Sequence, residues 1–198
     1  MKSSIYVIGA MLLILSASCG NSKSEKAIKA KEDSLRRQVY KDSKPVKEQF
    51  AATVKQAEER MKAAKSASYD AGIANALIKS YLDYANAFPN DTLSPDYIFR
   101  SAEIASSGGS YDQALILFKS VTDKYSRYKY VVEALYEEAM IYDSKLPGQT
   151  EKARIIYQQI IDDYPKHKLA EDAKIAIANL GKTDEQLVKE FEKKNHLK

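Results

Sequence analysis

Tryptophan is absent from this chain of 198 residues, which contains a single cysteine and two histidines. The single cysteine has no partner for a disulfide bond within the chain. His167 and His196 have no cysteine or carboxylate at the spacing that metal ligands require. The sequence therefore predicts no metal site.

An excess of one charge is also missing. The chain has 31 Lys+Arg and 27 Asp+Glu, a net charge of +4, and the two signs alternate along the sequence. The 14 tyrosines between the lysines could stack on bases, but five of them fall on repeated apolar stripes, which favours a role in the core. We therefore expect no nucleic-acid partner.

No arrangement of side chains points to catalysis. Adjacent carboxylates, such as those of Glu137 and Glu138, point about 100° apart on a helix and do not converge on one bond. The stretch 106–112, SSGGSYD, lacks the lysine of a phosphate-binding loop and follows a predicted helix. We expect a protein that is not an enzyme, with no cofactor and no small-molecule substrate.

Hydrophobic runs are confined to the N-terminus. Residues 1–18 carry Lys2, an apolar run from Ile5 to Leu15 and then small residues, the pattern of a secretion signal. The segment that ends at Cys19 resembles the lipobox of bacterial lipoproteins, although Ser16 stands where leucine is usual. An ordinary signal peptide, in which Cys19 is simply one more small residue, is the alternative.

The lipobox resemblance implies that Cys19 becomes the lipidated N-terminus and attaches the protein to a membrane. Gly20 and Asn21 follow Cys19, so the aspartate that retains lipoproteins in the inner membrane of enteric bacteria is absent. By this resemblance we expect an outer-membrane lipoprotein that faces the periplasm.

Residues 19–45 are polar and highly charged, which predicts a tether that is helical only transiently. Two short motifs, Asp33–Leu35 and Asp91–Leu93, resemble the O-glycosylation acceptor of Bacteroidetes. We expect both motifs to lie in a loop or in the tether, and the sequence does not decide whether either is glycosylated.

From residue 46 onwards the apolar pattern becomes helical and then repeats. In 150–167 the stripe positions have offsets of 0, 4, 7, 11 and 12 from Ala153, which places them on one face of a helix that a proline terminates. The three copies of this stripe are Leu77, Tyr81, Tyr84, Phe88, Pro89; Ala114, Phe118, Val121, Tyr125, Ser126; and Ala153, Tyr157, Ile160, Tyr164, Pro165. Their spacings of 37 and then 39 residues predict an array of helical repeats.

A second set of helical segments repeats with the same spacings. Phe99, Tyr136 and Ile175 are equivalent, as are Ala102, Ala139 and Ala178. Each unit is therefore predicted to be a hairpin of a helix A and a helix B, with an insertion of two residues in the loop of 144–151.

These units resemble tetratricopeptide repeats, because small residues occupy the expected positions in both helices and an aromatic residue follows in helix B. The position of the helix A tryptophan is instead Ile98 or Leu135, and the period exceeds the usual 34 residues by three or five. Lengthened repeats of this kind resemble those of periplasmic lipoproteins in outer-membrane barrel assembly and in cell-envelope division. The predicted fold is all-α: a solenoid of about three hairpins over residues 46–181, with a capping helix and tail at 182–198.

The resemblance implies a scaffold that binds envelope proteins on a concave surface formed by the A helices. The expected contact residues are Phe99, Arg100, Glu103, Tyr136, Glu137 and Met140. For Phe99 and Tyr136, packing between repeats is an equally good interpretation. The alternative function is a structural accessory subunit that bridges a membrane complex and peptidoglycan.

Overall fold

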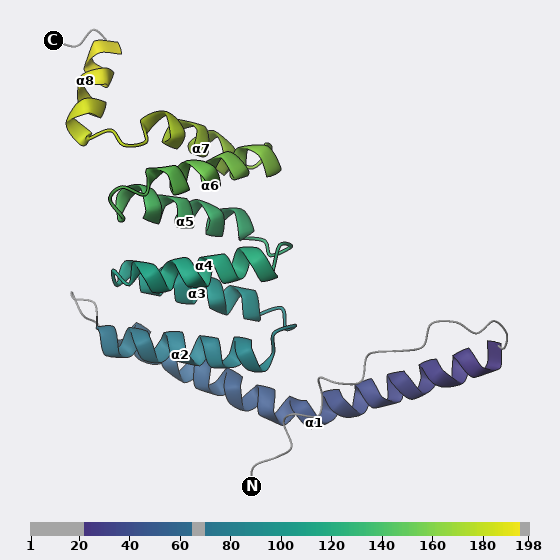
Figure 1. Ribbon diagram of the computed structural model, residues 1–198. Coiled ribbons are helices and arrows are strands. Elements are labelled where there is room, and N and C mark those ends of the chain that lie inside the picture. Colours follow the sequence, from purple (N-terminus) through teal and green to yellow (C-terminus); the bar gives the residue numbers. More distant parts are fainter. Residues whose placement is uncertain (1–21, 65–69, 195–198) are drawn as a thin grey trace. The chain divides into compact units, whose positions relative to one another are not determined.

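The computed structural model describes residues 22–64 and 70–194, and every regular element within these ranges is a helix (Figure 1). The helices are α1 (Ser22–Ala63), α2 (Ala71–Ala87), α3 (Ser94–Ser107), α4 (Tyr111–Lys124), α5 (Val131–Ser144), α6 (Thr150–Asp163), α7 (Lys168–Asn179) and α8 (Asp184–Lys194). The all-α fold and the predicted hairpins are therefore confirmed. Cys19 and the expected signal segment lie outside the described residues.

Two units divide the chain, Met1–Pro45 and Val46–Lys198, and the boundary falls within α1. In the first unit the described residues, 22–45, are helical, including the Asp33–Leu35 motif that we expected in a loop or in the tether. Residues 22–44 contain neither glycine nor proline, and their six lysines, two arginines, two alanines and two glutamates favour helix without any apolar stripe. Leu35 is 57% exposed.

In the second unit, each repeated stripe forms the buried face of a B helix, namely α2, α4 or α6. Phe118 and Val121 of α4 and Ile160 of α6 are fully buried, and Tyr157 is 1% exposed. Each of these helices ends at an aromatic residue of the stripe. The amide of Tyr125 donates to the Val121 carbonyl over 2.9 Å, and that of Tyr164 donates to the Ile160 carbonyl over 3.0 Å.

Alanines allow the two helices of each hairpin to approach closely. Ala102 of α3 and Ala114 of α4 are completely buried, and so are Ala139 of α5 and Ala153 of α6. A larger side chain at any of these positions would have to displace the neighbouring helix, because protein interiors are close-packed.

The hairpins stack in chain order, so that α2 to α7 lie side by side (Figure 1). One core cluster joins residues of α2, α3, α4 and α5, and another joins residues of α5, α6 and α7. The part of α1 that follows Pro45 contributes Val54 and Ala57 to a third cluster with α2. Because α5 contributes to two clusters, burial is continuous from one hairpin to the next.

A second contact repeats with the hairpins and links each helix A to a later loop. The residue three positions after the stripe aromatic binds a side chain in an A helix. The three pairs are Asp91 with Lys47, Tyr128 with Asp96, and His167 with Glu133.

The chemistry of these loop contacts differs from repeat to repeat. The Tyr128 hydroxyl donates to Asp96 Oδ1 over 2.9 Å, whereas His167 Nε2 lies 3.8 Å from Glu133 Oε1. At the first contact, burial alone would raise the pKa of Asp91, but hydrogen bonds from Lys47, the Leu93 amide and Tyr84 lower it. The position of the contact is thus kept while the pair of residues changes.

Burial decreases towards the end of α7, and α8, the next helix in the described residues, does not cover it as a helix B would. Ala178, the equivalent of the buried Ala139, is exposed, and Ile175 is 56% exposed. Helix α8 forms where the capping helix was predicted, yet its Val188 and Phe191 are 55% and 61% exposed. Within the described residues, α8 therefore leaves part of the final apolar face in contact with solvent.

The difference between Ala139 and Ala178 gives a direct test of the hairpin register. Ala139→Leu should lower the free energy of unfolding by about 1–3 kcal/mol, because leucine would overpack the contact between α5 and α6. Ala178→Leu makes the same chemical change at the equivalent exposed position and should have almost no effect. Urea denaturation measures both variants, and an equal loss in the two would contradict the register.

Candidate interaction surface

Four of the predicted contact residues are accessible and occupy equivalent positions in two repeats. Arg100 and Glu103 of α3 correspond, 37 residues later, to Glu137 and Met140 of α5. Arg100 and Glu103 are exposed, Glu137 is half-buried, and Met140 is 39% exposed. We call these four residues the A-helix face.

Of the other two predicted contact residues, Phe99 lies in the core and Tyr136 packs against the core while half-buried. Phe99 is only 8% exposed, and its ring centroid lies 5.7 Å from that of Phe118 and 5.8 Å from that of Tyr130. Tyr136 is half-buried, with its ring centroid 5.4 Å from that of Tyr157. The Phe99 ring is therefore fully used, and the Tyr136 ring largely used, in aromatic packing. Packing between repeats was the alternative interpretation of these two residues.

Arg100 is held in place by carboxylates from two helices. Its Nε atom lies 2.7 Å from Asp96 Oδ2, and one of its terminal nitrogens lies 3.7 Å from Glu58 Oε1. Glu58 also accepts a hydrogen bond of 2.7 Å from the Tyr81 hydroxyl. Burial and this hydrogen bond raise the pKa of Tyr81 to about 12. The positive charge of the Arg100 guanidinium is thus already paired with carboxylates of the same chain before any partner binds.

Glu103 and Glu137 give the A-helix face an acidic character. Burial raises the pKa of Glu103, and the charge of Glu137 raises it further. Burial also raises the pKa of Glu137. The charge of Arg100 acts in the opposite direction on the pKa of Glu103, but the pKa stays raised, and Arg100 also interacts with Asp96 and Glu58. The face combines accessible negative charge with the thioether of Met140, a flexible apolar side chain.

Sequence reasoning did not identify Glu58, Tyr81 or Asp96 as parts of this surface. Asp96 could have been found from its register, because it lies 37 residues before Glu133 and both residues make the loop contact described above. Tyr81 belongs to the first repeated stripe, which predicted its burial but not its hydrogen bond to Glu58. Glu58 carries no such signal, because it precedes the first repeated stripe.

Neither a metal site nor a membrane-spanning helix is found where the structure is described. Residues 22–64 and 70–194 contain no group of three or more His, Cys, Asp or Glu that could hold an ion. Within the same ranges, none of the helices combines the length and apolar character needed to cross a bilayer.

The comparisons with known proteins agree with the helical repeat architecture. A family model described as "Tetratricopeptide repeat" matches residues 133–167, which extend from the first turn of α5 through α6 to the residue before α7. A search of curated proteins found no significant match to the chain. The hairpin of α5 and α6 therefore matches the sequence pattern of a tetratricopeptide repeat, and repeats of this type generally bind protein partners.

The raised pKa of Glu137 predicts a dependence of stability on pH. A carboxyl whose pKa is higher in the folded state stabilises the fold below its ordinary pKa of 4.5, and this stabilisation is lost as the pH rises through the folded value. Glu137→Gln should therefore raise the free energy of unfolding at neutral pH by roughly 0.3–1 kcal/mol. The gain should disappear below about pH 4, where the wild-type carboxyl is protonated too.

Denaturation in urea at several pH values measures this effect. Glu59→Gln, at an exposed position of α1, is the matched control and should change stability equally at every pH. A Glu137→Gln variant that is less stable than the wild type at neutral pH would show that this carboxylate contributes favourably to the fold.

Proposed function

We propose that this protein is a non-enzymatic scaffold whose A-helix face receives a segment of a partner protein. The observation that carries this proposal is the placement of Arg100, Glu103, Glu137 and Met140 at equivalent positions of adjacent repeats, where they stay accessible. The neighbouring aromatic residues are buried, so the repeats form a firm base beneath this surface. An all-helical repeat fold of this type is typically an interaction scaffold rather than a catalyst.

The character of the face supports a protein ligand. Polar and charged groups line it in series along two helices, a geometry that suits an extended or helical segment better than a compact metabolite. Met140 can adapt its side chain to an apolar residue of the partner, while the carboxylates of Glu103 and Glu137 provide charge selectivity.

We further propose that the scaffold is anchored by lipid on Cys19, at the outer membrane and facing the periplasm, and that its partners are proteins of the cell envelope. The support comes from the sequence alone: a signal-like segment ends at Cys19, and no aspartate follows. Several acyl chains on one residue would hold the protein at the membrane almost permanently. Envelope assembly is the process that the resemblance of the repeats favours.

Site-specific photo-crosslinking in cells tests the A-helix face. A photoreactive residue at position 140 should give a crosslinked product of defined mass with a partner, and Glu137→Lys should abolish it. The same residue at position 155 on α6, where Ile155 is 62% exposed, is the control and should give no such product. Glu151→Lys, also on α6, is the matched charge change and should leave the product at position 140 intact.

The pattern of crosslinked products decides between binding surfaces. Products at position 155 alone, or at neither position, would contradict binding through the A-helix face. A product at position 140 that contains peptidoglycan rather than protein would favour the accessory subunit that bridges the cell wall.

The lipid anchor is tested by changing Cys19. Cys19→Ala should move the protein from the membrane fraction to the soluble fraction, because the acyl chains can no longer be attached. Ser16→Leu restores the usual lipobox residue and should leave the protein in the membrane. Mass spectrometry of the wild-type N-terminal peptide should find acyl groups, and an unmodified thiol there would contradict the anchor.

A further inference from the structure

A hollow of about 670 Å³ opens beside the start of α3, where the loop between α4 and α5 comes close to it. Leu93, Pro95, Asp96 and Arg100 line one side. The other side is formed by the loop and the end of α4, from Lys124 to Lys129. Its volume lies within the roughly 300–1,000 Å³ of ligand pockets, but it is open to solvent along its length.

Positive charge dominates this hollow. Lys124, Arg127 and Lys129 are exposed, and the Lys129 ammonium lies 4.4 Å from the ring centroid of Tyr130. Asp96 provides the negative charge in the lining, and both of its oxygens are already used, one by Arg100 and the other by Tyr128. The cations on the loop side are therefore not neutralised by the lining itself.

The walls of the hollow are fixed by contacts between repeats. The Tyr125 hydroxyl donates to the Pro89 carbonyl over 3.0 Å, which attaches this loop to the preceding one. The Tyr128 hydroxyl bonds to Asp96 over 2.9 Å, and its ring centroid lies 6.0 Å from that of Phe99. The backbone that carries the cations is thus held by hydrogen bonds to the preceding loop and to α3. A backbone fixed in this way lowers the entropic cost of binding.

We propose that this hollow binds an acidic segment of a partner protein, with carboxylates toward Lys124, Arg127 and Lys129. Charge complementarity selects such a ligand, and the guanidinium of Arg127 can accept a carboxylate in a bidentate geometry. Leu93, which is 44% exposed at the rim, offers an apolar contact to a hydrophobic residue between the acidic ones. This goes beyond the proposed function, because it places a second, oppositely charged surface at the edge of the repeats.

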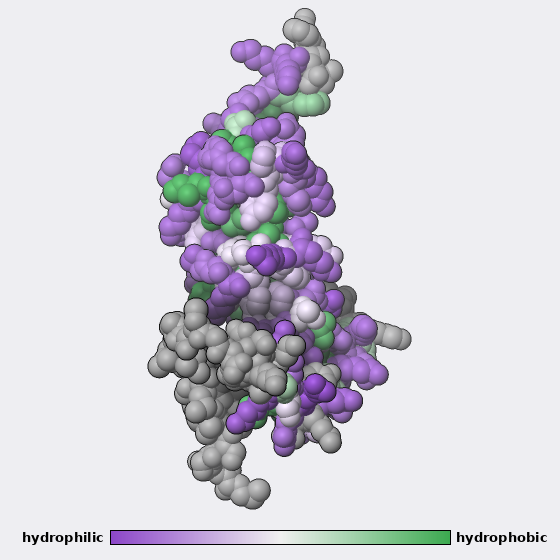
Figure 2. Space-filling model, turned by 90° about the vertical axis from the view of Figure 1, so that its right-hand side faces the viewer, coloured by the Kyte–Doolittle hydropathy of each residue, from purple (hydrophilic) through white to green (hydrophobic). Residues whose placement is uncertain are grey.

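The shape of the surface favours a peptide over a membrane. Figure 2 views the edge on which this loop lies, and the edge is mostly hydrophilic with small, separate hydrophobic areas. A flat anionic bilayer would contact protruding side chains, whereas the three cations here lie along one side of a recess that a chain of a few residues can enter. An extended acidic segment can reach all three cations at once.

Fluorescence anisotropy with the full chain in detergent tests the proposal. The probe is a short fluorescein-labelled peptide of glutamates with one central leucine. Lys124→Glu, Arg127→Glu and Lys129→Glu together should weaken its binding at least about tenfold. Binding to the wild type should also weaken as salt is added, because exposed charges are screened. Circular dichroism should find the variant folded, since its changes lie on exposed side chains.

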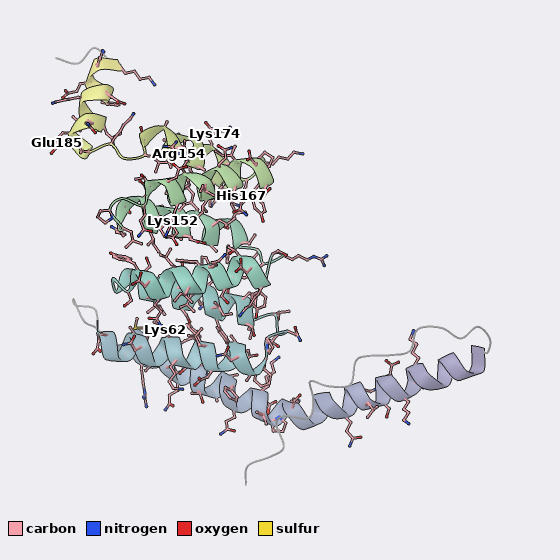
Figure 3. All side chains as sticks on the ribbon, viewed as in Figure 1. Lys62, Lys152, Arg154, His167, Lys174 and Glu185 are labelled. Carbon is pink, nitrogen blue, oxygen red and sulfur yellow. The ribbon has the colours of Figure 1, made fainter. Side chains whose placement is uncertain are left out.

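The matched control reverses three exposed lysines elsewhere, by Lys55→Glu, Lys62→Glu and Lys174→Glu. Figure 3 labels Lys62 and Lys174, which belong to α1 and α7. Peptide affinity should stay within about twofold of the wild-type value. An equal loss in both variants would mean that general charge attraction, not the hollow, binds the peptide, and would overturn the proposal.

A vesicle-binding experiment tests whether the loop cations bind an anionic lipid surface instead of an acidic peptide. Wild-type protein and the loop variant are sedimented with phosphatidylglycerol vesicles, with the Cys19→Ala change present in both so that no lipid anchor contributes. Loop-dependent binding to vesicles without peptide binding would overturn the proposal in favour of a lipid surface. Failure of the peptide to bind leaves the A-helix face untouched, because that face is tested by crosslinking at position 140.

Discussion

The fold depends on the close approach of two helices at small residues within each hairpin. Ala102 with Ala114, and Ala139 with Ala153, leave no exposed surface at the contact, so that large stripe residues such as Phe118 and Tyr157 can fill the space further along the same helix. This spacing sets the distance between successive A helices. The distance between the A helices determines which of their residues lie in the core and which are exposed to solvent.

The surfaces available for binding follow from how neighbouring hairpins are joined. The Tyr128 hydroxyl donates to Asp96, which fixes the loop against α3. The Tyr128 ring also packs near Phe99 and helps to bury it. The A helices are left with an acidic, adaptable surface around Glu137, while the braced loop carries the cations Arg127 and Lys129. Arg100, which belongs to the A-helix face and also lines the hollow, lies where these two surfaces of opposite charge adjoin.

The periodic stripes predicted the helices well, because each stripe ends at an aromatic residue whose amide closes the last turn, as at Tyr125 and Tyr164. Helix α1 was predicted to begin only near Val46, since residues 22–45 have helix-forming composition but no apolar stripe. The site was harder to predict. Phe99 and Arg100 are adjacent, and only the rings of a later loop decide that the first is buried. The pairing of Arg100 with Glu58 joins segments that have no common register.

Hydrogen exchange of backbone amides, resolved by helix and measured on the full chain, tests the central claim that burial builds through the hairpins and ends at α7. We expect the slowest exchange in α3 to α6, faster exchange in α7 and the fastest of these in α8. Protection of α8 equal to that of α5 would contradict the account, because it would mean that the last helix is an integral part of the core.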